Sequence, residues 1–182
     1  MIERKRVRYV ACLVAVAVLY LGESVRAQQT TPKFTSTTLT PFTPTFAEFQ
    51  VFNHLTQTDL QQVAPGYPGP TWTAMEQTKG PSDLYIQTNT WDPGASTGWH
   101  RHPGFSLIVI TSGTVVQYHA DCVPQVYGPN TPNGPTLIDS GDDEHLIRNE
   151  DGLGAKGYAV QIVAHTAPRK IVESAPDTCT IQ

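Results

Sequence analysis

The chain has 182 residues, of which 39% are hydrophobic and 15% charged, a composition typical of one globular domain and not of a disordered or multidomain protein. Residues 1–27 carry five of the 12 Lys and Arg and two of the 16 Asp and Glu, which leaves 7 positive against 14 negative side chains in the remainder. This net negative charge repels phosphate backbones and anionic lipid, so no nucleic-acid or membrane-surface partner is expected.

Residues 1–27 are predicted to form a secretory signal peptide. A basic start with Arg4, Lys5, Arg6 and Arg8 precedes an apolar run over 10–21 and a small-residue cleavage site that ends at Ala27. The run is shorter than the ~18 residues that a spanning helix needs. The mature protein is therefore expected to be secreted or periplasmic, without stable membrane insertion after cleavage. An uncleaved signal anchor is the alternative.

The cysteines agree with export. Cys12 lies in the predicted signal, so the mature chain keeps Cys122 and Cys179, an even pair in an oxidising compartment. We expect them to form a disulfide that ties the C-terminal tail to the body of the domain. Two unlinked thiols are the alternative.

Residues 28–46 are rich in Thr and Pro and hold too little apolar content to bury, so they are predicted to be an extended arm or linker. In an alternative interpretation, Phe42, Phe46 and Phe49 attach this arm to a sheet edge. Residues 47–62 have mixed spacing that suits one short helix or an edge strand, with the helix slightly preferred. The folded domain is taken as 47–182.

After Pro65 the pattern is that of an all-β domain, because short β-branched and aromatic runs alternate with Gly, Pro, Asn and Asp clusters. Six such strands favour a sandwich or barrel and argue against a parallel α/β fold. Ser112-Gly113 between two apolar runs predicts a hairpin turn. The predicted strands are 84–91, 105–111, 114–120, 136–139, 144–149 and 157–165.

The chemistry is expected at three histidines. His100 and His102 are two apart, a spacing that places both imidazoles on one face of a strand. Gly94 precedes this pair by six residues and Gly113 follows it, while later in the chain Gly134 precedes His145 and Asn149. An H-x-H pair alone is a weak signal, so this context carries the interpretation.

The two stretches resemble the motifs of the cupin superfamily, G-x5-H-x-H-x3,4-E-x6-G and G-x5-P-x-G-x2-H-x3-N. Ser106 stands where the family usually has a ligand Glu, Ser140 where it has Pro, and Asp142 where it has Gly. The resemblance implies an all-β, cupin-type antiparallel β-barrel, also described as a double-stranded β-helix or jelly roll. It also implies one divalent transition metal at His100, His102 and His145.

Three imidazoles leave coordination positions open, which is typical of a catalytic site rather than a closed structural one. Iron(II) is favoured, and zinc, manganese, nickel or copper would also suit these ligands. By similarity to three-histidine cupin dioxygenases, the first hypothesis is an oxygenase acting on a small organic substrate. The alternatives are a non-catalytic cupin that binds a metal or small ligand, and a structural domain with a vestigial site. Cupins often pair through sheet edges, which suggests a homodimer.

Two further residues are placed in or beside the pocket. Ser106 is expected to contact a metal-bound water rather than the ion itself, and Gln161 to face the lumen as a polar contact. Asp143 shares strand parity with His145 but lies in an acidic turn, so it is left out of the ligand set. The remaining histidines in the mature chain, His54, His119 and His165, are taken as ordinary strand-end or loop residues.

Overall fold

The computed structural model describes residues 31–40 and 42–182 of the chain, and the predicted signal peptide therefore lies outside the described residues. Within them, strands dominate and α1 (Gln57–Val63) is the one α-helix. No helix in this part of the chain is both long and apolar enough to cross a membrane.

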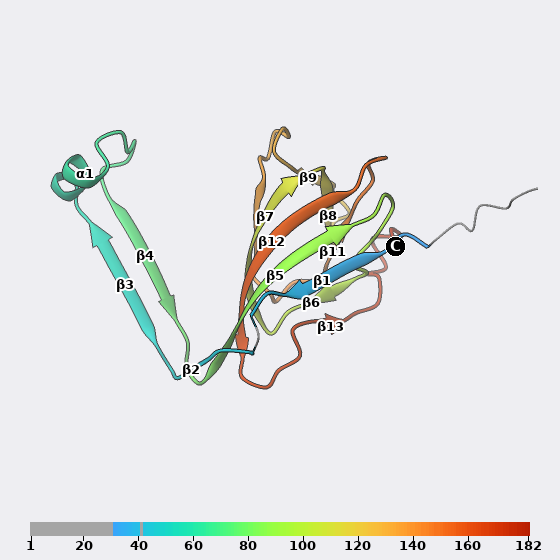
Figure 1. Ribbon diagram of the computed structural model, residues 1–182, viewed down its shortest axis with the longest axis horizontal. Helices are drawn as coiled ribbons and strands as arrows, with labels where there is room; N and C mark the ends of the chain where they lie inside the picture. Colours follow the sequence, from blue (N-terminus) through green and yellow to red (C-terminus); the bar gives the residue numbers. More distant parts are fainter. Residues whose placement is uncertain (1–30, 41) are drawn as a thin grey trace, which may run out of the picture. The chain divides into compact units, whose positions relative to one another are not determined.

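Two antiparallel sheets form the body of the fold, which confirms the all-β, antiparallel architecture expected from the sequence (Figure 1). The first has the order β1 (Phe34–Thr38), β5 (Ser82–Trp91), β12 (Ala155–Ala164), β7 (Gly104–Ser112) and β10 (Thr136–Asp139), with β2 (Thr45–Phe46) also paired to β5. The second has the order β13 (Ile171–Val172), β6 (His100–Arg101), β11 (His145–Arg148), β8 (Val115–His119) and β9 (Gln125–Tyr127).

Side chains alternate along these strands between the space enclosed by the two sheets and their outer faces. In β12, Ala155, Ala159 and Val163 are buried, whereas Tyr158 and Val160 are exposed. One apolar core joins the two sheets, and its members come from both of them. They are Trp91, Ala95, Ile108, Ile110, Val115, Leu137, Ile147, Ala155 and Ala159. This core holds the sheets in the relative position that the site between them requires.

The six predicted strands are all present, each within two residues of its expected ends. The hairpin predicted at Ser112-Gly113 is wrong, because β7 and β8 belong to different sheets and do not pair with each other. Gly113 has φ +70°, and a Cβ there would lie 2.5 Å from the carbonyl oxygen of Gly154. This glycine therefore allows a tight turn that carries the chain from one sheet to the other.

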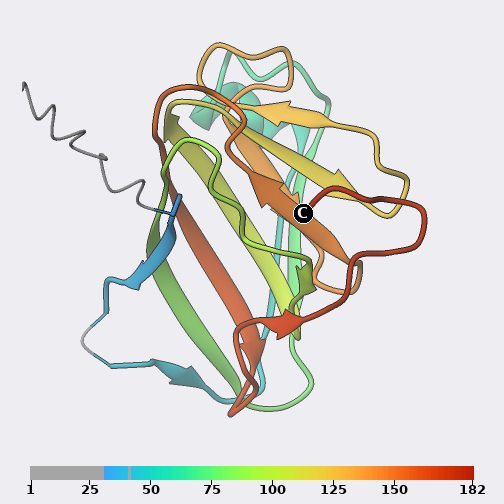
Figure 2. The same ribbon diagram turned by 90° about the vertical axis from the view of Figure 1, so that its right-hand side faces the viewer.

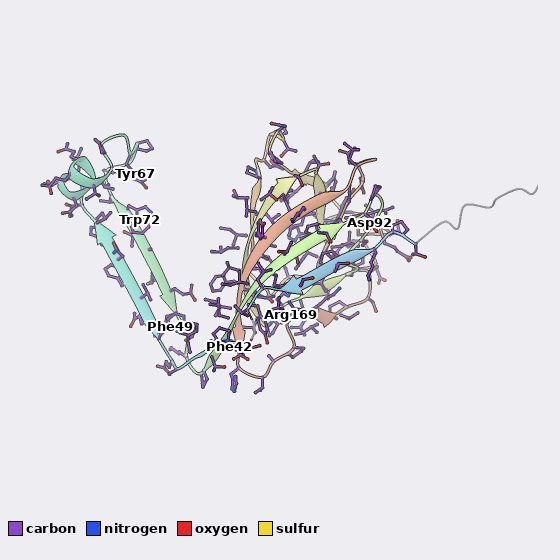
Figure 3. The ribbon with its side chains drawn as sticks, viewed as in Figure 1. Phe42, Phe49, Tyr67, Trp72, Asp92 and Arg169 are labelled. Atoms are coloured by element: carbon purple, nitrogen blue, oxygen red, sulfur yellow. A yellow bond between two sulfur atoms is a disulfide. The ribbon has the colours of Figure 1, made fainter. Side chains whose placement is uncertain are left out.

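Part of the predicted arm is a strand. Within 28–46, β1 pairs along its whole length with β5, and Phe34 packs on Trp91 with ring centroids 5.0 Å apart. The backbone N–H of Lys33 donates to Asp92 Oδ2 at 3.0 Å, where β5 ends (Figure 3). A Thr-rich segment can form a strand when a neighbouring strand pairs with its backbone N–H and C=O groups. Low apolar content was therefore not sufficient reason to predict an unpaired arm here.

Residues 47–62 contain a strand as well as a helix. β3 (Gln50–Leu55) pairs with β4 (Trp72–Gln77) in a separate two-stranded sheet, and α1 lies between them in the chain (Figure 1). Thr56 caps α1, since its backbone N–H donates to Asp59 Oδ2 at 2.9 Å and its hydroxyl accepts from Asp59 N. Trp72 on β4 and Tyr67 in the loop before it are both exposed (Figure 3).

The C-terminal tail packs on the outer face of the second sheet (Figure 2). A disulfide joins Cys122 and Cys179, as predicted. Buried Cys179 packs with outward-facing Trp99, Val116, Tyr118 and Leu146. Disulfides persist in oxidising compartments, so this bond agrees with an extracellular or periplasmic setting.

Candidate metal centre

His100, His102 and His145 converge between the two sheets. His145 on β11 is the register partner of His100 on β6, and His102 follows β6 directly. The ring centroids lie 4.3 Å apart for His100 and His145, 4.8 Å for His100 and His102, and 5.4 Å for His102 and His145. One ligand atom from each ring lies within 4.8 Å of the others, close enough to share one ion.

Each imidazole has its Nδ1 beside a backbone carbonyl oxygen. The distances are 2.8 Å from His100 to Gly98, 2.5 Å from His102 to Arg169, and 3.2 Å from His145 to Asp143. At His102, Nδ1 also lies 2.8 Å from the amide Nε2 of Gln161. At His100 and His145 the carbonyl oxygen can only accept a hydrogen bond, so the contact places the proton on Nδ1 and leaves Nε2 with a free lone pair. This is the tautomer that a metal ligand needs.

Burial keeps two of these rings, His100 and His145, uncharged. It lowers the pKa of His100 to about 3, with a smaller contribution from the nearby His145. Burial also lowers the pKa of His145, although Asp139 acts in the opposite direction. Both imidazoles are therefore neutral at neutral pH, and they can bind a cation without first releasing a proton.

Asp139 belongs to the same cluster, although it was not predicted from the sequence. Its Oδ2 lies 3.0 Å from His102 Nε2 and 3.3 Å from His145 Nε2. Burial acts to raise the pKa of this carboxyl, but the neighbouring imidazoles of His102 and His145 outweigh burial and lower it. The available signal was strand alternation, since Leu137 and Asp139 share one face of β10 and Leu137 is an obvious core residue.

Two atoms of the cluster are buried without any hydrogen-bond partner among the described residues, namely Asp139 Oδ2 and His145 Nε2. Leaving a buried polar atom unpaired costs about 1–3 kcal/mol, and more for a charged group. Both atoms are acceptors, and they lie 3.3 Å apart. A cation between them would satisfy both, so the residues present fit a metal ion.

Ser106 and Gln161 also face this space. Ser106 on β7 is the register partner of Asp139 on β10 and of Gln161 on β12, so the three form one polar row across the first sheet. All three are buried. Gln161 Nε2 lies 2.8 Å from His102 Nδ1 and donates to the carbonyl oxygen of Arg169 at 3.1 Å, the same oxygen that His102 Nδ1 contacts. Gln161 therefore contacts the group that positions a histidine.

A pocket of about 590 Å³, including its mouth, opens onto the three histidines. Aromatic and aliphatic side chains form much of its wall, including Phe34, Trp91, Ile108 and Ile147. Two cations, Arg169 and Lys170, also line it, and neither forms an ion pair within the described part of the chain. Arg169 follows β12 (Figure 3), and Lys170 donates to the carbonyl oxygen of Thr97. Burial lowers the pKa of Lys170.

The remaining candidates lie outside this cluster or at its margin. Asp143 Oδ2 is 2.6 Å from His119 Nδ1, and about half of the Asp143 side chain is exposed. His165 Nδ1 is 2.8 Å from Asp83 Oδ1, and His54 Nδ1 is 2.9 Å from the hydroxyl of Thr73. Each of these three histidines thus has a polar partner within hydrogen-bond distance, and its position is accounted for without a metal ion.

Comparison with known proteins gives matches among solved structures alone, since no family model and no curated protein matches the chain. A cupin superfamily protein from Desulfitobacterium hafniense is 18% identical over 44% of this chain and 67% of its own, with a TM-score of 0.38. A cupin domain from Bordetella pertussis is 19% identical over 44% and 82%, also at 0.38. The DMSP lyase DddQ from Ruegeria pomeroyi is 15% identical over 49% of this chain and 42% of its own, at 0.41.

Proposed function

We propose that this protein is an exported, metal-binding cupin that acts as a mononuclear metal-dependent oxygenase on a small anionic organic substrate. The observation that supports it best is the set of three imidazoles that line one pocket, each offering a ligand nitrogen within 4.8 Å of the others, while their Nδ1 atoms contact carbonyl oxygens. His100, His102 and His145 would hold the ion. When bound, the ion would supply Lewis acidity and a meeting point for substrate and dioxygen.

The chain's own residues have three tasks in this proposal. The carbonyl oxygens of Gly98, Arg169 and Asp143 orient the rings, which removes the cost of ordering the ligands when the ion binds. Phe34 and Trp91 form an apolar wall that limits access of water. The pocket volume restricts the substrate to a small molecule.

Charge supports an anionic substrate. Arg169 and Lys170 reach a pocket that is otherwise lined by neutral side chains. Lys170 is partly buried, and its ammonium has no ion-pair partner among the described residues. A substrate carboxylate, enolate or thiolate would supply the opposite charge. The substrate's charge would also be attracted by the metal ion. Enolates, thiolates and catecholates are the substrate classes that combine such charge with reactivity toward dioxygen.

The test begins with metal analysis of the purified mature protein, followed by anaerobic loading with iron(II) and measurement of oxygen uptake with small enolic, thiol and catechol substrates. One bound ion and substrate-dependent oxygen uptake are expected. Binding of an ion without turnover across the panel would indicate the non-catalytic alternative. Failure of a folded protein to bind any of the five candidate metals would overturn both.

His102→Ala is the decisive variant, with His54→Ala as the matched control. His102 Nε2 lies within the cluster, whereas His54 is on β3 and contacts Thr73. His102→Ala is expected to lose most of the bound ion while keeping its β-sheet circular dichroism, because the apolar core does not depend on the ion. His54→Ala should retain metal at the wild-type level.

A further inference from the structure

Position 106 lacks the carboxylate that the cupin motif usually places there, yet a carboxylate stands directly beside it. Ser106 on β7 and Asp139 on β10 are register partners on adjacent antiparallel strands. Side chains of such partners project to the same face of a sheet with their Cβ atoms about 4.5–5.5 Å apart. Both residues are buried and face the histidines. The sheet thus provides a second position from which a carboxylate reaches the same point.

We propose that Asp139 is the fourth, anionic ligand of the metal ion and that it replaces, from the neighbouring strand, the carboxylate absent at Ser106. This inference rests on the proposed metal centre and deepens it. The site would then consist of three neutral imidazoles and one carboxylate. With a divalent ion its net charge would be +1 rather than +2.

The distances agree with a shared ion. Metal bonds to imidazole nitrogen and carboxylate oxygen are about 2.0–2.2 Å long, so adjacent ligand atoms are separated by about 3.0 Å in an octahedral site and about 3.4 Å in a tetrahedral one. Asp139 Oδ2 lies 3.0 Å from His102 Nε2 and 3.3 Å from His145 Nε2. These are the separations expected of neighbouring ligands.

Hydrogen bonding leaves one oxygen of Asp139 available. Its Oδ1 accepts the backbone N–H of Gly141 at 2.8 Å, while Oδ2 is buried without a hydrogen-bond partner among the described residues. Gly141 therefore orients the carboxylate so that Oδ2 points toward the imidazoles. The backbone N–H of His102 donates to the carbonyl oxygen of Gly141 at 2.9 Å, which connects the turn after β10 to a second ligand.

Ser106 then has a different consequence for the site. A serine occupies less volume than a glutamate, so the position that the family's ligand would fill stays open to the pocket, which Ser106 lines. Like the family's site, the proposed ligand set contains one carboxylate. Here the carboxylate comes from Asp139 on β10 and not from position 106 on β7. The substrate would approach the ion past Ser106.

The experiment measures cobalt(II) or zinc affinity by competition with a chelator, in the absence of any substrate. Asp139→Asn keeps the shape of the side chain and removes its charge. It is expected to weaken metal binding at least tenfold and to change the visible absorption spectrum of bound cobalt(II). Asp142→Asn, an exposed carboxylate three residues away, is the matched control and should bind within twofold of wild type.

A double variant tests the replacement itself. Ser106→Glu with Asp139→Ser moves the carboxylate back to the motif position, and it should recover most of the affinity that Asp139→Ser alone loses. If Asp139→Asn binds metal as wild type does, Asp139 is not a ligand and the inference is overturned. Failure of the wild-type protein itself to bind metal would instead refute the proposed function.

Folding of the variants is checked by circular dichroism. If Asp139→Asn does not fold, the infrared spectrum of the wild-type protein tests whether an aspartate carboxylate binds the metal. With ¹³C-labelled aspartate, metal addition should shift a carboxylate stretch in wild type and in Asp142→Asn. No carboxylate shift on saturation with metal would overturn the assignment.

Discussion

The imidazole of His102 and the side-chain amide of Gln161 share one acceptor, the carbonyl oxygen of Arg169, at 2.5 and 3.1 Å. A strand of the first sheet thereby supports a histidine of the second, because Gln161 lies on β12 whereas His102 follows β6. The Oε1 atom of Gln161 in turn accepts from Gln87 Nε2 at 3.4 Å. The amide is thus held between a neighbour on β5 and the loop that orients His102.

Gln161→Ala should therefore weaken metal binding about 10–100-fold without abolishing it, because His102 would remain a ligand but lose a support for its orientation. Chelator competition with zinc measures the effect. Gln61→Ala, an exposed glutamine on α1, is the control and should bind as wild type does. Unchanged affinity in Gln161→Ala would show that Arg169 positions His102 alone.

Removing the disulfide should destabilise the protein strongly. The bond between Cys122 and Cys179 closes a segment with a sequence separation of 57 residues. On the chain-entropy account a loop of this length contributes about 4 kcal/mol. The Cys122→Ser, Cys179→Ser double variant should lose about this much free energy of unfolding in urea denaturation. Reductant should lower the stability of wild type to the same level and leave the variant unaffected. A loss under about 1 kcal/mol would contradict the expectation.

Asp83 should make stability depend on pH. Its Oδ1 accepts the hydroxyl of Thr45 at 2.6 Å and lies 2.8 Å from His165 Nδ1, and its Oδ2 accepts the backbone N–H of Thr166 at 3.2 Å. The hydrogen bond from Thr45 is the main cause that lowers the pKa of Asp83, against the opposing effect of burial. The folded state therefore favours the carboxylate.

A lowered pKa stabilises the fold above the unfolded-state pKa of ~3.9, and this stabilisation is lost as the pH falls through the folded-state value. Asp83→Asn should lower the free energy of unfolding by about 1–3 kcal/mol at pH 7. The difference from wild type should shrink in urea denaturation at pH 3. Asp177→Asn, an exposed control, should match wild type at both pH values. If the difference in free energy of unfolding between Asp83→Asn and wild type grew as the pH fell, the predicted direction of the pH dependence would be wrong.

Gly141→Ala should damage the turn that carries Asp139. Gly141 has φ +99°, and a Cβ there would lie 1.9 Å from the carbonyl oxygen of Gly104. The strained backbone alone costs about 1–3 kcal/mol, and the clash adds to it. Both stability and zinc affinity should fall, because Gly141 contacts Asp139 and His102. Gly152→Ala is the control, since nothing lies within 4 Å of its Cβ position. Equal behaviour of the two variants would exclude the proposed role of this turn.

Strand periodicity and motif spacing were sufficient to predict the main strands, the three histidines and the cysteine pair. Period-two alternation is a local property, so 136–139 and 157–165 could be recognised as strands without knowing their partners. The two-residue step from His100 to His102, and the spacing of the glycines around them, are likewise read along the chain.

Tertiary structure alone revealed which strands pair and in which register. Nothing near Ser112 shows that β7 and β8 enter different sheets, and nothing near Thr37 shows that a Thr-rich segment finds β5 as its partner. Asp139 is the clearest case, because its place beside Ser106 and the histidines depends on how β10 aligns with β7 across about thirty intervening residues. Register is set by packing and hydrogen bonds between distant segments, so local sequence could supply the carboxylate but not its position.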